Sequence, residues 1–190
     1  MKKDSINIVW LKRDIRAQDH EPLFHAENSN LKYYVIYIFE PSMIAYPDTS
    51  LRHLKFIYHS ILALNKILAP YNRKVEIFYG EAIEVFSFIN KSFNVNSILS
   101  YRESGTEFSW DRDKKIQQLC KLNKIYWYQF QRDGIIRGIK TRKNWRKNWN
   151  LKMAQPIIKN NFSICINEKL QHPFLIPSKL ENILKTYPKK

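Results

Sequence analysis

The stretch INIVWLKRDIRAQDHEPL, residues 6–23, decides how the rest of the chain is arranged. Its first part, Ile6 to Leu11, is an apolar run of the length expected for a strand covered on both faces, although periodicity alone does not exclude a buried helix. Asp19 and Pro22 are helix-start signals, because the first turn of a helix has N–H groups without partners and tolerates proline. Between the apolar run and Asp19 lies a group of charged residues: Lys12, Arg13, Asp14 and Arg16. The stretch therefore predicts a buried strand, a charged turn and a helix.

Further apolar runs rich in β-forming residues alternate with helical patterns downstream. We predict strands over residues 33–39, 74–79, 97–101 and 124–130, and helices over residues 22–28, 50–69, 81–90 and 109–122. Alternation of strand and helix with short connections is the pattern of a parallel sheet with helices on both faces. We therefore predict an α/β fold, a Rossmann-like doubly wound five-stranded parallel sheet with strand order 3-2-1-4-5. In that order the loop at residues 10–16 lies beside the loop at residues 100–107, where such sheets bind ligands.

The composition changes after the predicted fifth strand. Residues 134–167 contain eight Lys or Arg and no Asp or Glu, and Trp145, Trp149 and Met153 recur every four residues. This spacing predicts a helix with an aromatic stripe and a basic face. The part that follows, residues 162–190, contains three prolines and the pattern of a short helix near residues 179–185. We predict an α/β domain over residues 1–133 and, over residues 134–190, a basic helical carboxyl-terminal tail that serves as an aromatic-containing extension and interdomain linker.

The formal net charge is +15, from 32 Lys and Arg against 17 Asp and Glu, with a pI near 9.8. Such a charge favours polyanionic partners, first nucleic acid and then an anionic membrane surface or a phosphorylated ligand. A solvated lysine-rich surface is the alternative. With 44% hydrophobic residues, the chain has enough apolar side chains for a core.

The sequence lacks the motifs on which several classes of protein function depend. The two cysteines form no Cys-x-x-Cys motif and the five histidines are scattered, so we expect neither a metal site nor a disulfide, and a reducing compartment. The four glycines form neither a Gly-x-Gly-x-x-Gly turn nor a P-loop. No Ser, Cys or Thr lies in a recognisable nucleophile context, so no catalytic residue is assigned. Since no apolar run approaches the length of a membrane span, we expect a cytoplasmic protein.

Charged residues at the ends of the predicted strands are the candidate ligand contacts. Arg13 is expected to contact a ligand, whereas the adjacent opposite charges of Asp14 and Arg16 favour an internal ion pair. Glu40 and Glu103 either accept hydrogen bonds from a heterocycle or cap the next helix.

A second set of candidates consists of cations. Arg52 opposes the dipole in the first turn of its helix, so a carboxylate or a ligand is expected beside it. In the basic segment, cations mixed with tryptophans suit phosphate backbones and base stacking, or an amphipathic helix that packs its tryptophans on this domain or on a partner domain. The candidate nucleic-acid contacts are Arg142, Lys143, Arg146 and Lys147.

The run from Trp10 to Arg16, continuing through Asp19 and His20 to Leu23, resembles the opening motif of the DNA photolyase and cryptochrome family. Other blocks are similar to further family motifs: Val35–Pro41, the helix that begins near Arg52, Glu103–Thr106, Asp111–Lys114 and Gly134–Arg137. The resemblance covers nearly the whole chain but only the amino-terminal α/β domain of the family.

In that family the α/β domain can hold a light-harvesting antenna chromophore, such as a folate, a deazaflavin or a flavin, at the carboxyl ends of the strands. The resemblance makes these residues candidates for antenna binding: Arg13, Glu40, Arg52 and Glu103, with apolar contacts from Leu11, Ile38 and Phe39.

The family's larger helical domain binds FAD and repairs pyrimidine dimers in DNA with a light-driven electron. We expect this domain to be absent here and the chain to end in the interdomain linker, as a fragment or a split subunit. The resemblance implies that the chain alone is not catalytic and that it docks an FAD-binding domain, in cis or as a separate chain. The complete protein would be a deoxyribodipyrimidine photolyase, a light-dependent carbon–carbon lyase, or a cryptochrome photoreceptor.

Two further expectations follow. If a partner domain is missing, apolar surface should be exposed near Trp10, Trp145 and Trp149. The alternative function is a free-standing, non-catalytic basic module that binds nucleic acid.

Overall fold

The computed structural model describes residues 3–135, 140–165 and 170–186. Its centre is a five-stranded, all-parallel sheet with strand order β3-β2-β1-β4-β5. The strands are β1 (Ser5–Leu11), β2 (Lys32–Phe39), β3 (Val75–Tyr79), β4 (Asn94–Tyr101) and β5 (Tyr126–Phe130). The predicted fold class and strand order are confirmed.

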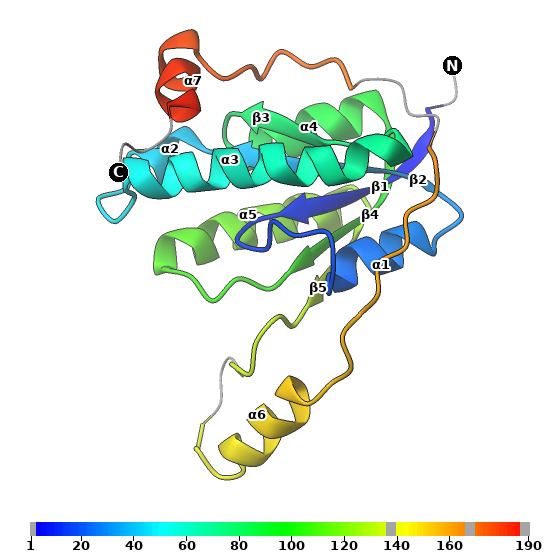
Figure 1. The fold of residues 1–190 in the computed structure, drawn as a ribbon, viewed down its shortest axis with the longest axis vertical. Helices are drawn as coiled ribbons and strands as arrows, with labels where there is room; N and C mark the ends of the chain where they lie inside the picture. Colours follow the sequence, from blue (N-terminus) through cyan, green and yellow to red (C-terminus); the bar gives the residue numbers. More distant parts are fainter. Residues whose placement is uncertain (1–2, 136–139, 166–169, 187–190) are drawn as a thin grey trace.

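Helices cover both faces of the sheet (Figure 1). On one face lie α1 (Glu21–Glu27) and α3 (Leu51–Leu68), and on the other lie α4 (Ala82–Ser92) and α5 (Glu107–Leu122). Alternate residues of β1 point to opposite faces, so that Trp10 packs with α4 and α5 while Val9 packs with α1 and α3. The other elements are α2 (Pro41–Ile44), the 3-10 turn η1 (Ala69–Tyr71), α6 (Trp145–Met153) and α7 (Ser178–Lys185).

Several element boundaries differ from the prediction, and the largest difference is at β4, which begins three residues earlier than predicted, at Asn94. Asp19 has a φ of 54°, and the N-cap of α1 is His20, whose Nδ1 accepts a hydrogen bond from Leu23 N at 3.1 Å. Lys124 has a φ of 57°, which a strand does not allow, so β5 begins two residues later than predicted, at Tyr126. The single-turn helix α2 lies between the predicted strand over residues 33–39 and the predicted helix over residues 50–69, where no helix was predicted.

After α6, the chain returns and packs on the α/β domain. Backbone hydrogen bonds join Asp19 to Ile158 and Tyr79 to Phe174, each between N and O. Leu170 joins the core on the α4–α5 face, and Leu184 of α7 is fully buried against α3 on the other face. The predicted linker thus contributes two side chains, Leu170 and Leu184, to the core of residues 3–133.

Helix α6 stands clear of the sheet domain at the end of an excursion between β5 and residue 158 (Figure 1). Residues 136–139, 166–169 and 187–190 of the predicted basic extension lie outside the described residues. Among the described helices, none has both the length and the apolar character needed to cross a membrane.

Candidate functional site

Six charged side chains meet where the carboxyl ends of β1, β2 and β4 approach α5. We call them the carboxyl-edge cluster, and they are Lys12, Arg13, Glu40, Glu103, Arg112 and Asp113. Arg13 Nε lies 2.9 Å from Glu103 Oε1. This contact confirms that the loops following β1 and β4 are neighbours, as the strand order predicted. With three cations and three carboxylates, the cluster is balanced in formal charge.

Arg112 is the centre of the cluster. Its guanidinium donates to Glu40 Oε1 at 3.0 Å, to Glu103 Oε2 at 2.7 Å and to Asp113 Oδ1 at 2.8 Å. It also lies over the Trp10 ring, 4.9 Å from the ring centroid. Burial opposes its charge, but the three carboxylates raise the pKa of Arg112 above its ordinary value. One side chain of α5 therefore holds the ends of β2 and β4 together.

Lys12 is the most deeply buried cation of the cluster. Its side chain is 5% exposed, and its Nζ lies 3.0 Å from Asp113 Oδ2 and 4.2 Å from the Trp10 ring centroid. Burial lowers the pKa of Lys12, against the attraction of Asp113. Lys12 and Arg112 thus share Asp113 and stand over the same indole ring.

Glu40 and Glu81 cap each other's helices. Glu40 is the N-cap of α2, but its Oε2 accepts a hydrogen bond from Ala82 N, in the first turn of α4, at 3.2 Å. Glu81 is the N-cap of α4, and its carboxylate accepts from Ser42 N of α2 at 2.9 Å and from Ser42 Oγ at 2.6 Å. Burial raises the pKa of Glu40, although Arg112 opposes the shift. Of the two alternatives for Glu40, a cap on the next helix, α2, is not what the structure shows, since its side chain caps α4 instead.

The remaining antenna candidates lie in different surroundings. Both oxygens of Glu103 are used, one by Arg13 and one by Arg112. The side chain of Arg13 is 58% exposed, so Arg13 is the cluster residue that reaches solvent. Beneath the edge, the apolar candidates are core residues: Leu11 is 1% exposed, Ile38 6% and Phe39 2%.

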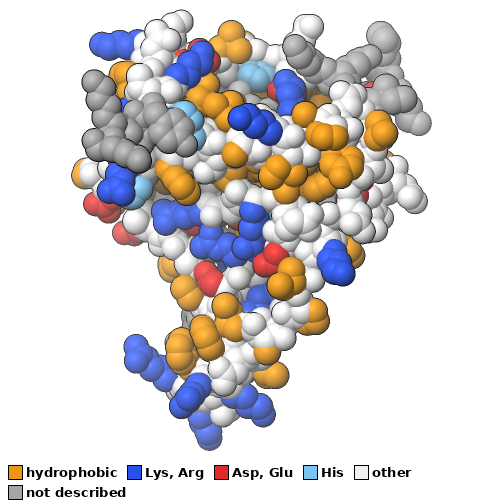
Figure 2. Space-filling model, viewed as in Figure 1, with side chains coloured by type: hydrophobic (Ala, Val, Ile, Leu, Met, Phe, Trp, Pro, Cys, Tyr) orange, Lys and Arg blue, Asp and Glu red, His pale blue; other side chains and the backbone are white. Residues whose placement is uncertain are grey.

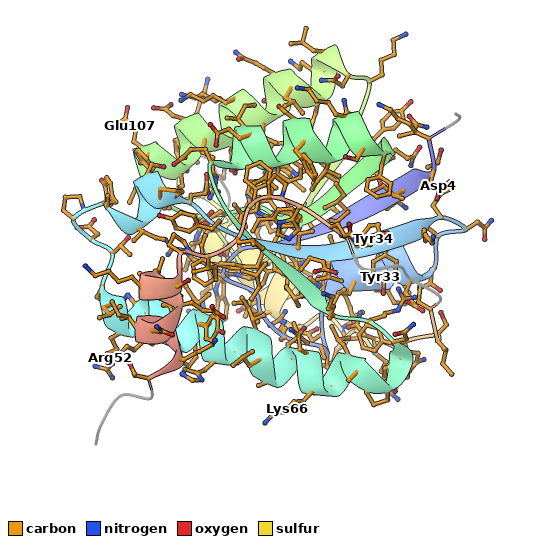
Figure 3. The ribbon with its side chains drawn as sticks, turned by 90° about the horizontal axis from the view of Figure 1, so that it is seen from above. Asp4, Tyr33, Tyr34, Arg52, Lys66 and Glu107 are labelled. Carbon is orange, nitrogen blue, oxygen red and sulfur yellow. The ribbon has the colours of Figure 1, made fainter. Side chains whose placement is uncertain are left out.

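Arg52 is not part of the cluster. It is an exposed residue of α3, and no ion pair joins it to a carboxylate within residues 3–135, 140–165 or 170–186. Seen from above, Arg52 at the start of α3 and Glu107 at the start of α5 lie on opposite faces of the sheet (Figure 3). The expected carboxylate partner of Arg52 is therefore absent from the described part of the chain.

Asp14 and Arg16 do not pair with each other, and that prediction is wrong. Asp14 Oδ2 lies 2.7 Å from His20 Nε2, and both side chains are buried, while Arg16 pairs with Asp19 at 3.2 Å. His20 Nδ1 accepts from a backbone N–H, so Nε2 carries the proton that is donated to Asp14. Sequence adjacency thus did not decide the ion-pair partners.

The predicted nucleic-acid contacts lie together on the excursion. Arg142, Lys143, Arg146 and Lys147 are all exposed. Figure 2 shows Lys and Arg gathered at the lower tip of the molecule, where α6 lies. The expectation of exposed apolar surface is confirmed at Trp145 and Trp149, which are 43% and 40% exposed, whereas Trp10 itself is buried, at 2% exposed.

The pattern of the sequence did not reveal the role of Arg112, because its partners come from distant segments. The available signal was the Asp-Arg-Asp run at residues 111–113 in the helix after the fourth strand. An aromatic pair at this edge was also missed: the rings of Tyr46 and Phe108 lie 5.3 Å apart, centroid to centroid. The structure shows no group of three or more metal-ligating side chains among the residues it describes.

Comparison with known proteins identifies the relatives of this arrangement. A family model described as DNA photolyase matches residues 7–157. Cryptochrome DASH of Synechocystis is 28% identical over 128 residues, which cover 63% of this chain and 26% of that protein.

Solved structures show the same fold. A photolyase of the archaeon Sulfolobus tokodaii, crystallised with two FAD molecules and discussed as evidence for a novel light-harvesting cofactor, matches with a TM-score of 0.73 at 23% identity. The match covers 95% of this chain and 42% of that one. A class III photolyase of Agrobacterium tumefaciens also has a TM-score of 0.73, at 18% identity, and the match covers all of this chain and 40% of that one.

The chain thus spans about a quarter of the length of the cryptochrome it matches and about two fifths of these photolyases. The family model covers well over half of the chain, and it includes the opening motif and the carboxyl-edge cluster. The chain therefore belongs to the DNA photolyase family and has the fold of its amino-terminal α/β domain.

Proposed function

We propose that this chain binds a light-harvesting chromophore at the carboxyl edge of its sheet and docks an FAD-binding domain for light-dependent repair of pyrimidine dimers in DNA. The observation that carries the proposal is the carboxyl-edge cluster, in which Arg112 joins the ends of two strands and leaves Arg13 directed to solvent. In open α/β sheets, ligands bind in this place, outside the carboxyl ends of the strands. The Sulfolobus photolyase, with its proposed light-harvesting cofactor, supports the same function.

Within this proposal the internal charges are structural and the outer side chains contact the chromophore. Glu40, Glu103 and Arg112 hold one another, which orients Arg13 through its ion pair with Glu103. Arg13 would bind an anionic group of the chromophore, such as the phosphate of a flavin or the carboxylate of a folate. The aromatic pair of Tyr46 and Phe108 would lie beside a planar ring. The repair chemistry would belong to FAD in the partner domain, to which this chain contributes no catalytic residue.

Titration of the chain with FAD, FMN, a deazaflavin and a methenyl-folate tests the proposal. Chromophore fluorescence anisotropy should rise on binding. Arg13→Ala should raise the Kd about tenfold, since a hydrogen bond to a charged group contributes roughly 1.5 kcal/mol or more.

The matched control is Lys121→Ala, which removes an exposed cation in the last turn of α5, away from the carboxyl ends of the strands. It should leave the Kd unchanged. If none of the four pigments binds, or if both variants weaken binding equally, the proposed chromophore site is wrong.

A further inference from the structure

The α6 excursion is held at its base and free at its tip. On the outgoing side, Arg132 Nη1 donates to Arg13 O at 3.0 Å, and Asp133 Oδ1 accepts from Ile135 N at 3.0 Å. On the returning side, Asp19 N donates to Ile158 O at 2.9 Å and Asp19 Oδ1 accepts from Ile158 N at 3.2 Å. The outgoing and the returning segment of the excursion, at Arg132 and Ile158, are therefore both attached to the loop after β1.

A close contact orients the helix on this base. A Cβ placed on the buried Gly134 would lie 2.2 Å from Trp149 Cδ1, so only glycine allows the indole to approach the backbone this closely. Trp149 therefore anchors one side of α6. The cations then project from a helix that is held in place.

The charge of the excursion is unbalanced. Residues 134–167 contribute eight of the chain's fifteen net positive charges in less than a fifth of its length. Arg142, Lys143, Arg146 and Lys147 are exposed, and within the described ranges none of them forms an ion pair. Like charges gathered without counter-charges repel each other, and a polyanion relieves that repulsion.

The dimensions of the helix suit a duplex. Helix α6 has nine residues and is therefore about 14 Å long. Duplex DNA carries a phosphate for roughly every 1.7 Å of its axis, so this length faces about eight phosphates. Three asparagines, Asn144, Asn148 and Asn150, add amide groups that can donate to phosphate oxygens.

We propose that α6 and the turn before it form a phosphate-contacting surface that binds double-stranded DNA without sequence preference, through Arg142, Lys143, Arg146 and Lys147. The partner is inferred from charge complementarity between the exposed cations and the phosphates of the duplex. Trp149 and Gly134 position the helix and do not contact the DNA. The surface lies outside the carboxyl-edge cluster, so this proposal does not depend on chromophore binding.

The experiment measures the affinity of the chain for a fluorescent 20-base-pair duplex at several salt concentrations. The slope of log K against log salt reports the number of phosphates neutralised, at about 0.9 for each contact. Replacing the four cations with Ala should reduce the slope by about 3.6 and weaken binding at least tenfold near 0.1 M salt.

The matched control removes four exposed lysines from other elements, Lys66, Lys91, Lys115 and Lys121, so that the net charge falls by the same amount. This control should keep nearly the whole slope. Circular dichroism of both variants should match the parent chain, because every replaced side chain is exposed.

Three results would overturn the proposal: no measurable binding of duplex, an equal loss in the α6 variant and the control, or an unchanged slope in the α6 variant. Loss of binding to anionic lipid vesicles with DNA binding intact would assign the surface to a membrane instead. Chromophore titration of the α6 variant should match that of the parent chain, which separates this result from the test of the carboxyl edge.

Discussion

The carboxyl-edge cluster and the α6 excursion use cations in opposite ways. In the cluster, Lys12 and Arg112 are largely buried and each is paired with carboxylates from other segments. In the excursion, the cations are exposed and the surrounding sequence has no acidic residue. Burying an unpaired charge is costly, whereas an exposed charge is solvated. Lys12 and Arg112 therefore stabilise the fold, whereas the excursion cations remain available to a partner.

Arg112→Leu is expected to have the largest effect on stability. It removes the partner of Glu40 and Glu103, which remain buried, so the free energy of unfolding should fall by about 3 kcal/mol. Urea denaturation followed by circular dichroism measures the change. Arg146→Leu, the matched variant in the excursion, should stay within about 0.5 kcal/mol of the parent chain. A loss below about 1 kcal/mol for Arg112→Leu would contradict the contrast between the two regions.

A third charged group, around Glu27 at the other end of the sheet, extends the comparison, because its contribution to stability depends on pH. Glu27 accepts from Tyr33 Oη at 2.5 Å and from Ser163 N at 2.6 Å, and it pairs with Arg73 at 3.0 Å. Burial alone would raise its pKa, but the hydrogen bonds from Ser163 and Tyr33, with the charge of Arg73, hold the pKa of Glu27 below its ordinary value of 4.5. Its contribution to stability is therefore present above pH 4.5 and is lost as the pH falls through the lower pKa of the folded state.

Glu27→Gln should destabilise the chain by about 2 kcal/mol at pH 7 and by progressively less as the pH falls below the ordinary pKa of Glu. Thermal or urea unfolding between pH 7 and pH 3 measures the difference. The control is Asp111→Asn, which removes an exposed ion pair with Lys114 and should leave the stability nearly unchanged at every pH. A constant difference between Glu27→Gln and the parent chain at every pH would show that the charge of Glu27 is not responsible.

Alanine at the four cations of α6 and the turn before it should have the smallest effect on stability. These side chains make no ion pair with described residues, so the free energy of unfolding should change by less than about 0.5 kcal/mol. At low salt the variant should be slightly more stable, because repulsion among the cations is removed. The melting temperature at low and high salt measures this effect. A clear loss of stability would mean that the cations support the fold as the cluster cations do.

The sequence predicted the sheet well because the signals of strands and helices are local. Apolar runs, prolines and helical spacing each lie within a few residues of the element they indicate. The strand order followed from the usual topology of alternating strands and helices, and it correctly placed the loop of Arg13 beside that of Glu103. Errors occurred at the boundaries: a positive φ at Lys124 delays β5, and β4 begins at Asn94, three residues before the predicted start.

Partner choice among charges was beyond the sequence, since it depends on which segments meet in space. Asp14 pairs with His20 rather than with its near neighbour Arg16. The caps of α2 and α4 are exchanged between residues 39 to 42 positions apart.

By itself, the sequence determined the α/β class, the family and the basic character of the segment around α6. The tertiary structure decided which charges are neutralised: Arg112 reaches Glu40 across 72 positions, and Asn160 binds His20 across 140. The physical reason is that periodicity and composition act over a few residues. Desolvation and ion pairing depend on distances that only the folded chain defines.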